Sequence, residues 1–178
     1  FSDLWDFIGV RQSLPGNGAR ARSGAFPFEL AFRLINMYSV QEDTVLDPFV
    51  GTGTTTAAAI SGARNSIGVE LSADLGEVID RTVQASGTAA NERQHHRLAA
   101  HREFMDNYRG RRPEAKLYTN VPHDVAVVTS QETDLAIPAV ASITRTKTGV
   151  YQAEHVTQTT AGPVLATVTG FPGQVMLL

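Results

Sequence analysis

Cysteine is absent from this 178-residue chain, and its absence removes several classes of chemistry. A disulfide framework, a thiolate nucleophile and a cysteine-ligated zinc or iron–sulfur centre all need this side chain. The chain also has no apolar run near the roughly 18 residues of a transmembrane helix. Its first residues do not combine a basic segment with an apolar one. These absences favour a cytoplasmic protein.

Positive charge is also scarce. The chain has 15 Lys and Arg against 18 Asp and Glu, a formal net charge of −3, whereas indiscriminate nucleic-acid binding needs many cations. The cations gather in two stretches. Arg11, Arg20 and Arg22 lie in or beside a Gly- and Pro-containing segment, where we predict weak DNA contacts, and a second group runs from Arg93 to Lys116. A solvated helix face or an ordinary surface loop explains each cluster equally well.

A metal-ligand pattern is missing as well. His95, His96 and His101 form a small histidine group, but two ligands share one face of a helix only three or four positions apart. The adjacent pair and the following gap do not supply that spacing. We therefore expect a polar helix face here and no metal site.

What the sequence does contain is an alternation of apolar runs and turn residues. The order strand, helix, strand, helix between residues 43 and 86 predicts a parallel sheet. The expected elements are a helix over 26–38 begun after Pro27, a strand over 43–49, a helix over 54–61, a strand over 65–71, helices over 72–86 and 93–108, a third strand over 123–130, a hairpin over 140–158 around Thr148-Gly149, and an irregular segment or weak strand over 161–178.

A glycine-rich turn, within VLDPFVGTGTTTAAAI at residues 45–60, joins the first strand of this pattern to its helix. Phosphate, dinucleotides and S-adenosylmethionine all bind on such turns. A phosphate-binding P-loop needs a lysine that is missing here. The dinucleotide fingerprint fits Gly51 and Gly53 but has Thr56 in place of its third glycine. That change weakens the interpretation as a nicotinamide-cofactor site without excluding it. A turn with a purely structural role is a third interpretation.

Two acids at strand ends help to choose among these ligands. Glu70 follows the turn by about 20 residues, where a parallel-sheet fold places a carboxylate beside a ribose diol. Asp47 begins the turn, where its negative charge would repel a phosphate and attract the cationic methionine part of S-adenosylmethionine. Charge therefore favours S-adenosylmethionine as the cofactor.

The combined motifs FPFELAFRLI and DTVLDPFVGTGTTTAAAISGARNSIGVEL, within Ala25–Leu71, resemble the cofactor half of the β-class DNA amino-methyltransferases. Thr52 stands where that family usually has Ser, and the His-Pro pair common before FP is absent. The resemblance implies a doubly wound, mostly parallel α/β sheet of the S-adenosylmethionine-dependent, Rossmann-like type, incomplete in this chain. It also implies methyl transfer to an exocyclic amine of adenine or cytosine in DNA.

The resemblance further implies roles for individual residues. Phe26 and Pro27 would flank the methionine moiety, and Glu70 would hold the ribose. The cofactor turn would be formed by Asp47, Pro48, Phe49, Gly51 and Gly53, with Thr54 and Thr55 donating hydrogen bonds at the helix start. Phe49 fits a place in the core equally well.

The family's catalytic tetrapeptide, (Asp/Asn/Ser)-Pro-Pro-aromatic, has no counterpart here, because the sequence has no Pro-Pro pair. We therefore assign no catalytic residue and expect the chain alone not to transfer methyl groups. It is interpreted as the C-terminal part of a longer methyltransferase or as a split subunit, with an upstream half or a restriction subunit as partner. The alternatives are a noncatalytic subunit that binds S-adenosylmethionine or DNA, and a NAD-dependent oxidoreductase.

The expected organisation has three parts. Residues 1–24 would end a DNA-facing region with a basic loop. Residues 25–145 would form the cofactor-binding α/β domain, and residues 146–178 a C-terminal hairpin or irregular tail.

Overall fold

A computed structural model of the chain describes residues 4–7, 10–12, 22–157 and 173–177. Its largest sheet has the strand order β3-β4-β9-β8-β7. The strands are β3 (Thr44–Asp47), β4 (Asn65–Gly68), β9 (Gly173–Leu177), β8 (Val150–Thr157) and β7 (Pro138–Lys147). β3–β4 and β4–β9 are parallel, while β9–β8 and β8–β7 are antiparallel. The α/β class is confirmed, and the sheet is mixed rather than mostly parallel because β7 and β8 form a hairpin.

The crossover from β3 to β4 runs through α2 (Thr54–Ser61), as the sequence predicts. Ala57, Ala58 and Ala59 are buried along this helix. Their small side chains let the helix lie close to its neighbours, and α2 contacts β3, β4 and β7 as well as the other two helices. Gly62 follows as the C-cap and ends the helix.

The predicted helix after Pro27 is confirmed as α1 (Phe28–Tyr38). Pro27 is extended, with φ −67° and ψ 148°, so the helix begins one residue later. Its Ala31 and Ile35 are buried in one cluster with Ala58 and Ala59 of α2. The sequence predicts an apolar stripe of Leu30, Leu34 and Met37, and this stripe is not the packed face, because Leu34 is 41% and Met37 is 45% exposed. The helix packs on α2 through the neighbouring face instead.

The two helices predicted over 72–86 and 93–108 are one element, so their separation is wrong. A short 3-10 turn at Ala73–Leu75 leads into α3 (Gly76–Arg111), a single helix of 36 residues. Gly87 follows directly after the first predicted helix, where a glycine can end a helix. It instead lies against β7, where an added Cβ would meet Val140 Cγ1 at 3.2 Å. The glycine permits close packing between α3 and the sheet, and the helix continues through it.

Side chains farther along α3 tie the same stretch to the backbone of β7 and of the residue before it. Asn91 Nδ2 donates to the Val140 carbonyl at 2.9 Å, and the Val140 amide donates to Asn91 Oδ1 at 2.8 Å. Gln94 Nε2 donates to the Ile137 carbonyl at 2.6 Å. These bonds hold residues 87–94, where the sequence suggested a gap between helices, against the sheet.

The third predicted strand, over 123–130, is present but does not join the main sheet, so its predicted place in the parallel sheet is wrong. Its residues form β6 (Val125–Val127), which pairs antiparallel with β5 (Tyr118–Asn120) in a separate two-stranded sheet. Asp124, just before β6, has φ 47° and helps to reverse the chain. His101 Nε2 of α3 lies 2.8 Å from the Ala126 carbonyl, so the small sheet rests on the helix.

The predicted hairpin around Thr148-Gly149 is confirmed. Lys147 pairs with Val150 across a two-residue turn in which Gly149 has φ 70°. Part of the predicted irregular tail is strand β9, and residues 158–172 lie outside the described chain.

The N-terminal basic segment contains an antiparallel pair, β1 (Val10–Gln12) and β2 (Arg22–Ala25). Arg11 and Arg22 lie in this pair, and Arg20 lies outside the described residues. Their predicted DNA contacts stay a prediction.

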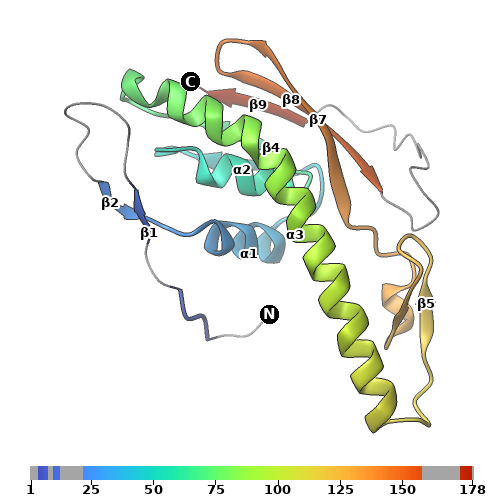
Figure 1. Cartoon of the computed structure of the whole chain (residues 1–178). Coiled ribbons are helices and arrows are strands. Elements are labelled where there is room, and N and C mark those ends of the chain that lie inside the picture. Colours follow the sequence, from blue (N-terminus) through green and yellow to red (C-terminus); the bar gives the residue numbers. More distant parts are fainter. Residues whose placement is uncertain (1–3, 8–9, 13–21, 158–172, 178) are drawn as a thin grey trace.

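Cross-strand register shows how the helices cover the sheet. Val45 pairs with Ser66, whose row continues through β9 to Tyr151, so these three residues share one face. Thr56 of α2 bonds Ser66 on that face, and Asp80 of α3 bonds Tyr151. Figure 1 shows α3 running across the neighbouring elements and beyond them. On the opposite face Leu46 is 63% exposed, so helices on both faces are not confirmed in the described part.

The main core lies between this sheet face and α2 and α3. Its buried members include Ile60, Val83, Val140 and Tyr151. Although α3 has the length to cross a bilayer, no helix among the described residues combines that length with enough apolar character.

Candidate functional site

The glycine turn between β3 and α2 depends on backbone angles that favour glycine. Gly51 has φ 56° and Gly53 has φ 89°, in the left-handed region where a Cβ is strained. Gly53 is also the N-cap of α2, and an added Cβ would meet Ile79 Cγ2 at 3.5 Å. The turn is therefore both conformationally special and close to the start of α3.

Glu70 fastens this turn to the end of the neighbouring strand. The Gly51 amide donates to Glu70 Oε2 at 3.0 Å, and the Ser72 amide donates to Glu70 Oε1 at 2.9 Å. A carboxylate has about four acceptor positions on its two oxygens, so each oxygen can accept a further bond. The acid singled out in the sequence is thus fixed in place by two backbone donors and keeps acceptor capacity.

The backbones beside Glu70 are also joined. The Val50 amide donates to the Val69 carbonyl at 3.0 Å, and the Val69 amide donates to the Asp47 carbonyl at 2.9 Å. The carboxyl ends of β3 and β4 therefore meet, as parallel neighbours should. Asp47, the glycine turn and Glu70 come together at this edge of the sheet.

Asp47 and Phe49 occupy the solvent side of the turn. Asp47 Oδ1 accepts a hydrogen bond from the Phe49 amide at 3.0 Å, a local bond that shapes the turn. Phe49 is 87% exposed. The core interpretation of Phe49 is therefore wrong, and its ring is free to meet a ligand or another surface.

The remaining predicted residues are less closely gathered. Thr54 and Thr55 open α2 and are half-buried beside the turn, while Pro48 is exposed. Phe26 and Pro27 stand before α1. Across the described chain, no hydrogen bond or ring contact links these two residues to the glycine turn. The structure thus brings together Asp47, the glycine turn and Glu70, and it shows no such contact for Phe26 and Pro27 among the described residues.

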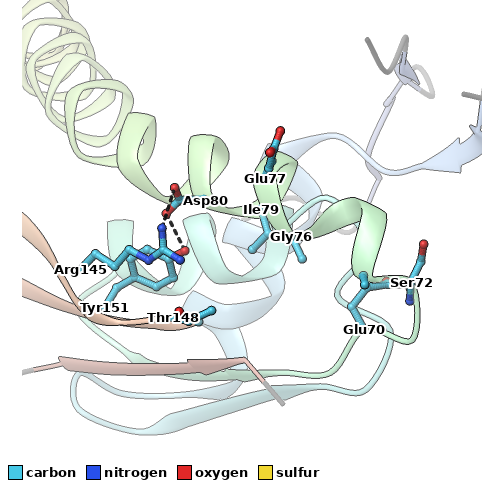
Figure 2. Close-up of a pocket in the computed structure, with 11 residues that line it drawn as sticks. Glu70, Ser72, Gly76, Glu77, Ile79, Asp80, Arg145, Thr148 and Tyr151 are labelled. Atoms are coloured by element: carbon cyan, nitrogen blue, oxygen red, sulfur yellow. Dashed lines mark hydrogen bonds and ion pairs between the residues drawn. The ribbon is translucent and has the colours of Figure 1, made fainter. Parts of the chain in front are cut away.

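A cavity of about 420 Å³ opens next to Glu70. The loop after β4 contributes Glu70 and Ser72, while α3 contributes Gly76, Ile79 and Asp80. Figure 2 shows Glu70 and Ser72 at one end of the group and Asp80 with Tyr151 and Arg145 at the other. The remaining wall comes from the β7–β8 hairpin, through Arg145, Thr148, Gly149 and Tyr151.

A small polar cluster joins that hairpin to α3. The Tyr151 hydroxyl donates to Asp80 Oδ1 at 2.7 Å, and Arg145 Nη1 lies 3.4 Å from Asp80 Oδ2. Tyr151 is only 1% exposed. Burial, helped by the hydrogen bond and charge of Asp80, raises the pKa of Tyr151 to about 12 against the opposing effect of Arg145. The phenol therefore stays protonated at neutral pH and holds the hairpin wall in position.

Sequence reasoning missed this hairpin wall. The predicted turn at Thr148-Gly149 would place Thr146 opposite Tyr151, but a register shift between Arg145 and Lys147 places Arg145 there instead. Nothing local to the hairpin indicates that this pair faces Asp80, 71 positions before Tyr151. Ser72 had a stronger signal, because it follows Glu70 by two residues and its amide is in reach of that carboxylate.

The histidines do not converge. His101 contacts the Ala126 carbonyl, whereas His95 and His96 are exposed. In residues 22–157 and the shorter described segments, no group of three His, Asp or Glu side chains is placed to hold a metal ion.

This geometry is shared with a known class of protein. A glycine turn after one parallel strand and an acid at the end of the next occur together in α/β proteins that bind a ribose-containing cofactor. A family model described as DNA methylase matches residues 1–81. The chain belongs to the DNA amino-methyltransferase family.

Curated relatives agree with this family. The chain is 42% identical over 138 residues to the type II methyltransferase M.MthZI of Methanothermobacter thermautotrophicus, which is 77% of this chain and 37% of that protein. It is 46% identical over 83 residues to the type II methyltransferase M.MjaI of Methanocaldococcus jannaschii, covering 47% of this chain and 27% of that protein. The chain thus spans well under half the length of these relatives. No solved structure matches it.

Proposed function

We propose that the chain is the cofactor-binding part of a site-specific DNA methyltransferase. The enzyme would transfer a methyl group from S-adenosylmethionine to an exocyclic amine of adenine or cytosine. The observation that carries the proposal is the bond from the Gly51 amide to Glu70, which fixes this acid beside the glycine turn, where it would bind a ribose. The relatives' printed names as type II methyltransferases support the reaction. An enzyme acting on cellular DNA in this way would work in the cytoplasm.

The residues present fit S-adenosylmethionine. Glu70 lines the cavity, and the acceptor positions left by its two backbone bonds suit the two ribose hydroxyls. The adenine would enter the cavity toward Ser72 and the hairpin wall. The methionine end would lie along the turn near Asp47, with Phe26 and Pro27 beside it and the amides of Thr54 and Thr55 at the helix start. Pro48 and Phe49 would border this end of the site.

Charge around the cavity supports a cationic cofactor. Glu70, Glu77 and Asp80 line it, against the single cation Arg145. The sulfonium and ammonium groups are attracted by such a field, while a pyrophosphate is repelled. When bound, the cofactor supplies an activated methyl group. The residues of this chain bind and orient it, and we assign none of them to the methyl-accepting site.

The exposed face of the sheet also belongs to the proposal. In the whole enzyme the sheet would be doubly wound, with helices on both faces. Leu46 supports this arrangement, because a leucine 63% exposed on an otherwise regular strand leaves apolar surface for another segment to cover. DNA and an upstream methyltransferase half, or a restriction subunit, are the proposed partners.

Transfer of labelled methyl groups tests the proposal. The chain would be incubated with methyl-labelled S-adenosylmethionine and mixed-sequence DNA, alone and with the portion of M.MthZI that lies outside the matched region. We expect cofactor binding in both cases and labelled adenine or cytosine only in the mixture. Binding without transfer in the mixture would favour a noncatalytic subunit. No binding of the cofactor in either case would refute the proposal.

A further inference from the structure

Charge is distributed unevenly between the cofactor end of the molecule and the far end of α3. Residues 39–80 contain seven carboxylates and one cation, Arg64, whereas residues 97–116 contain six cations and three carboxylates. We call the second segment, Arg97–Lys116, the basic arm. The net charge of −3 conceals this separation, which gives the basic arm a positive field of its own.

The cations of the basic arm are available to a partner. Arg97, Arg102, Arg109, Arg111, Arg112 and Lys116 are all exposed. The ion pairs found in the described segments use Arg33, Arg93 and Arg145 instead. The arm's three carboxylates therefore leave all six of its cations unneutralised by direct contact.

Aromatic rings organise part of this surface. Arg112 lies over the Tyr108 ring at 5.8 Å, and Lys116 lies over the Tyr118 ring at 5.0 Å. Phe104 is 47% exposed and is 5.9 Å from the Tyr108 ring centroid. Cations held on rings lose less freedom when they bind an anion, and mixed basic and aromatic surfaces are common where proteins meet nucleic acids.

The basic arm takes little part in the packed core, although His101 within it contacts β6. Five buried residues lie on α3 from Ile79 to Gln94, whereas Met105 alone is buried among the helical residues that follow. Figure 1 shows this end of α3 extending away from α1 and α2, with β5 beside it. A long polar helix that contributes little to the core is typical of a surface used for contact outside the domain.

We propose that the basic arm binds the phosphate backbone of duplex DNA, an inference that takes the DNA substrate from the proposed function. Phosphates accept bidentate hydrogen bonds from arginine, and five of the six cations are arginine. Arg102 and Arg109 are seven positions apart, two helical turns along the same side. The arm begins about 30 Å along α3 from Gly76 at the cavity, so it contacts DNA away from the cofactor.

Two matched double variants test the basic arm. Arg109→Gln with Arg111→Gln removes two arm cations, and Arg81→Gln with Lys147→Gln removes two exposed cations from elsewhere. Both variants have the same net charge. Fluorescence anisotropy would follow binding of a labelled duplex, several helical turns long, from about 50 to 200 mM salt. Calorimetry with S-adenosylhomocysteine would follow the cofactor site separately.

The arm variant should lose affinity for DNA by about ten- to a hundredfold near 0.1 M salt, with a log–log salt slope about two units smaller. The control variant should keep most of the affinity and slope, and both should bind S-adenosylhomocysteine unchanged. Equal losses in the two variants, or no duplex binding by the unaltered chain, would overturn the inference. A chain that binds DNA through the arm but ignores the cofactor would refute the proposed function and leave this inference standing.

Discussion

The two halves of α3 share one helix and have opposite surroundings. From Ile79 to Gln94, buried side chains recur at successive turns and meet the core and β7. From Arg97 to Arg111, Met105 alone is buried and cations are frequent. The first half is therefore held by tertiary packing next to the proposed cofactor site, while the second half contacts the small β5–β6 sheet through His101 and keeps its cations exposed.

The largest difference in unfolding free energy should come from placing a carboxylate on each half of α3. Val83 is 0% exposed in the main core, so Val83→Asp buries a carboxylate without a partner and should cost about 4 kcal/mol or more of unfolding free energy. Ala99→Asp puts the same side chain on an exposed position of the same helix and should cost less than about 1 kcal/mol. Urea unfolding followed by circular dichroism measures both. Similar losses would contradict the comparison.

Cofactor affinity should fall when a residue next to the start of α3 is replaced, and should not change when a residue of the basic arm is replaced. Glu70→Ala removes the acceptor for the Gly51 and Ser72 amides and for the proposed ribose contact. We expect S-adenosylhomocysteine binding to weaken by about 1.5–3 kcal/mol, the range for hydrogen bonds to a charged group. Glu103→Ala removes an exposed carboxylate of the basic arm and serves as the control. Unchanged affinity in Glu70→Ala would reduce Glu70 to a structural residue of the turn.

The bond between Tyr151 of the hairpin wall and Asp80 of α3 should make the free energy of unfolding depend on pH. Because the pKa of Tyr151 is about 12 in the folded chain and 10.0 ordinarily, its stabilisation is complete below pH 10 and is lost as pH rises through 12. Tyr151→Phe deletes the bond to Asp80 and should cost about 1 kcal/mol at neutral pH. The difference in stability between the two proteins should shrink from pH 10 to 12. A constant difference over that range would exclude the Tyr151–Asp80 bond as its source.

The smallest difference in stability should come from two of the glycines in α3, Gly87 and Gly110. Gly110 has nothing within 4 Å of an added Cβ, whereas at Gly87 that atom would meet Val140 at 3.2 Å. Gly110→Ala should stabilise the helix by a few tenths of a kcal/mol, since alanine is the better helix former and the site is near the helix end. Gly87→Ala should bring no gain, because β7 would have to move. A clear gain in Gly87→Ala thermal stability would show that α3 and β7 are less tightly packed than described.

Local rules predicted the elements around the glycine turn well. Pro27, the Gly51–Gly53 turn and the apolar strands beside it each need particular backbone angles or periodicity, and their elements were found where expected. The continuity of α3 was missed because Gly87 usually weakens a helix, and its compensation is contact with Val140, far along the chain. The bond from Tyr151 to Asp80 was also missed because its two residues are far apart in the sequence. The topology of β6 depends on pairing with β5, which periodicity alone does not specify.

The proposed cofactor site can be tested by calorimetric titration of the chain with S-adenosylmethionine, S-adenosylhomocysteine and NAD. We expect saturable binding of both sulfur compounds at one site per chain, weakened in Glu70→Ala, and little response to NAD. Tight binding of NAD with no response to either sulfur compound would contradict it.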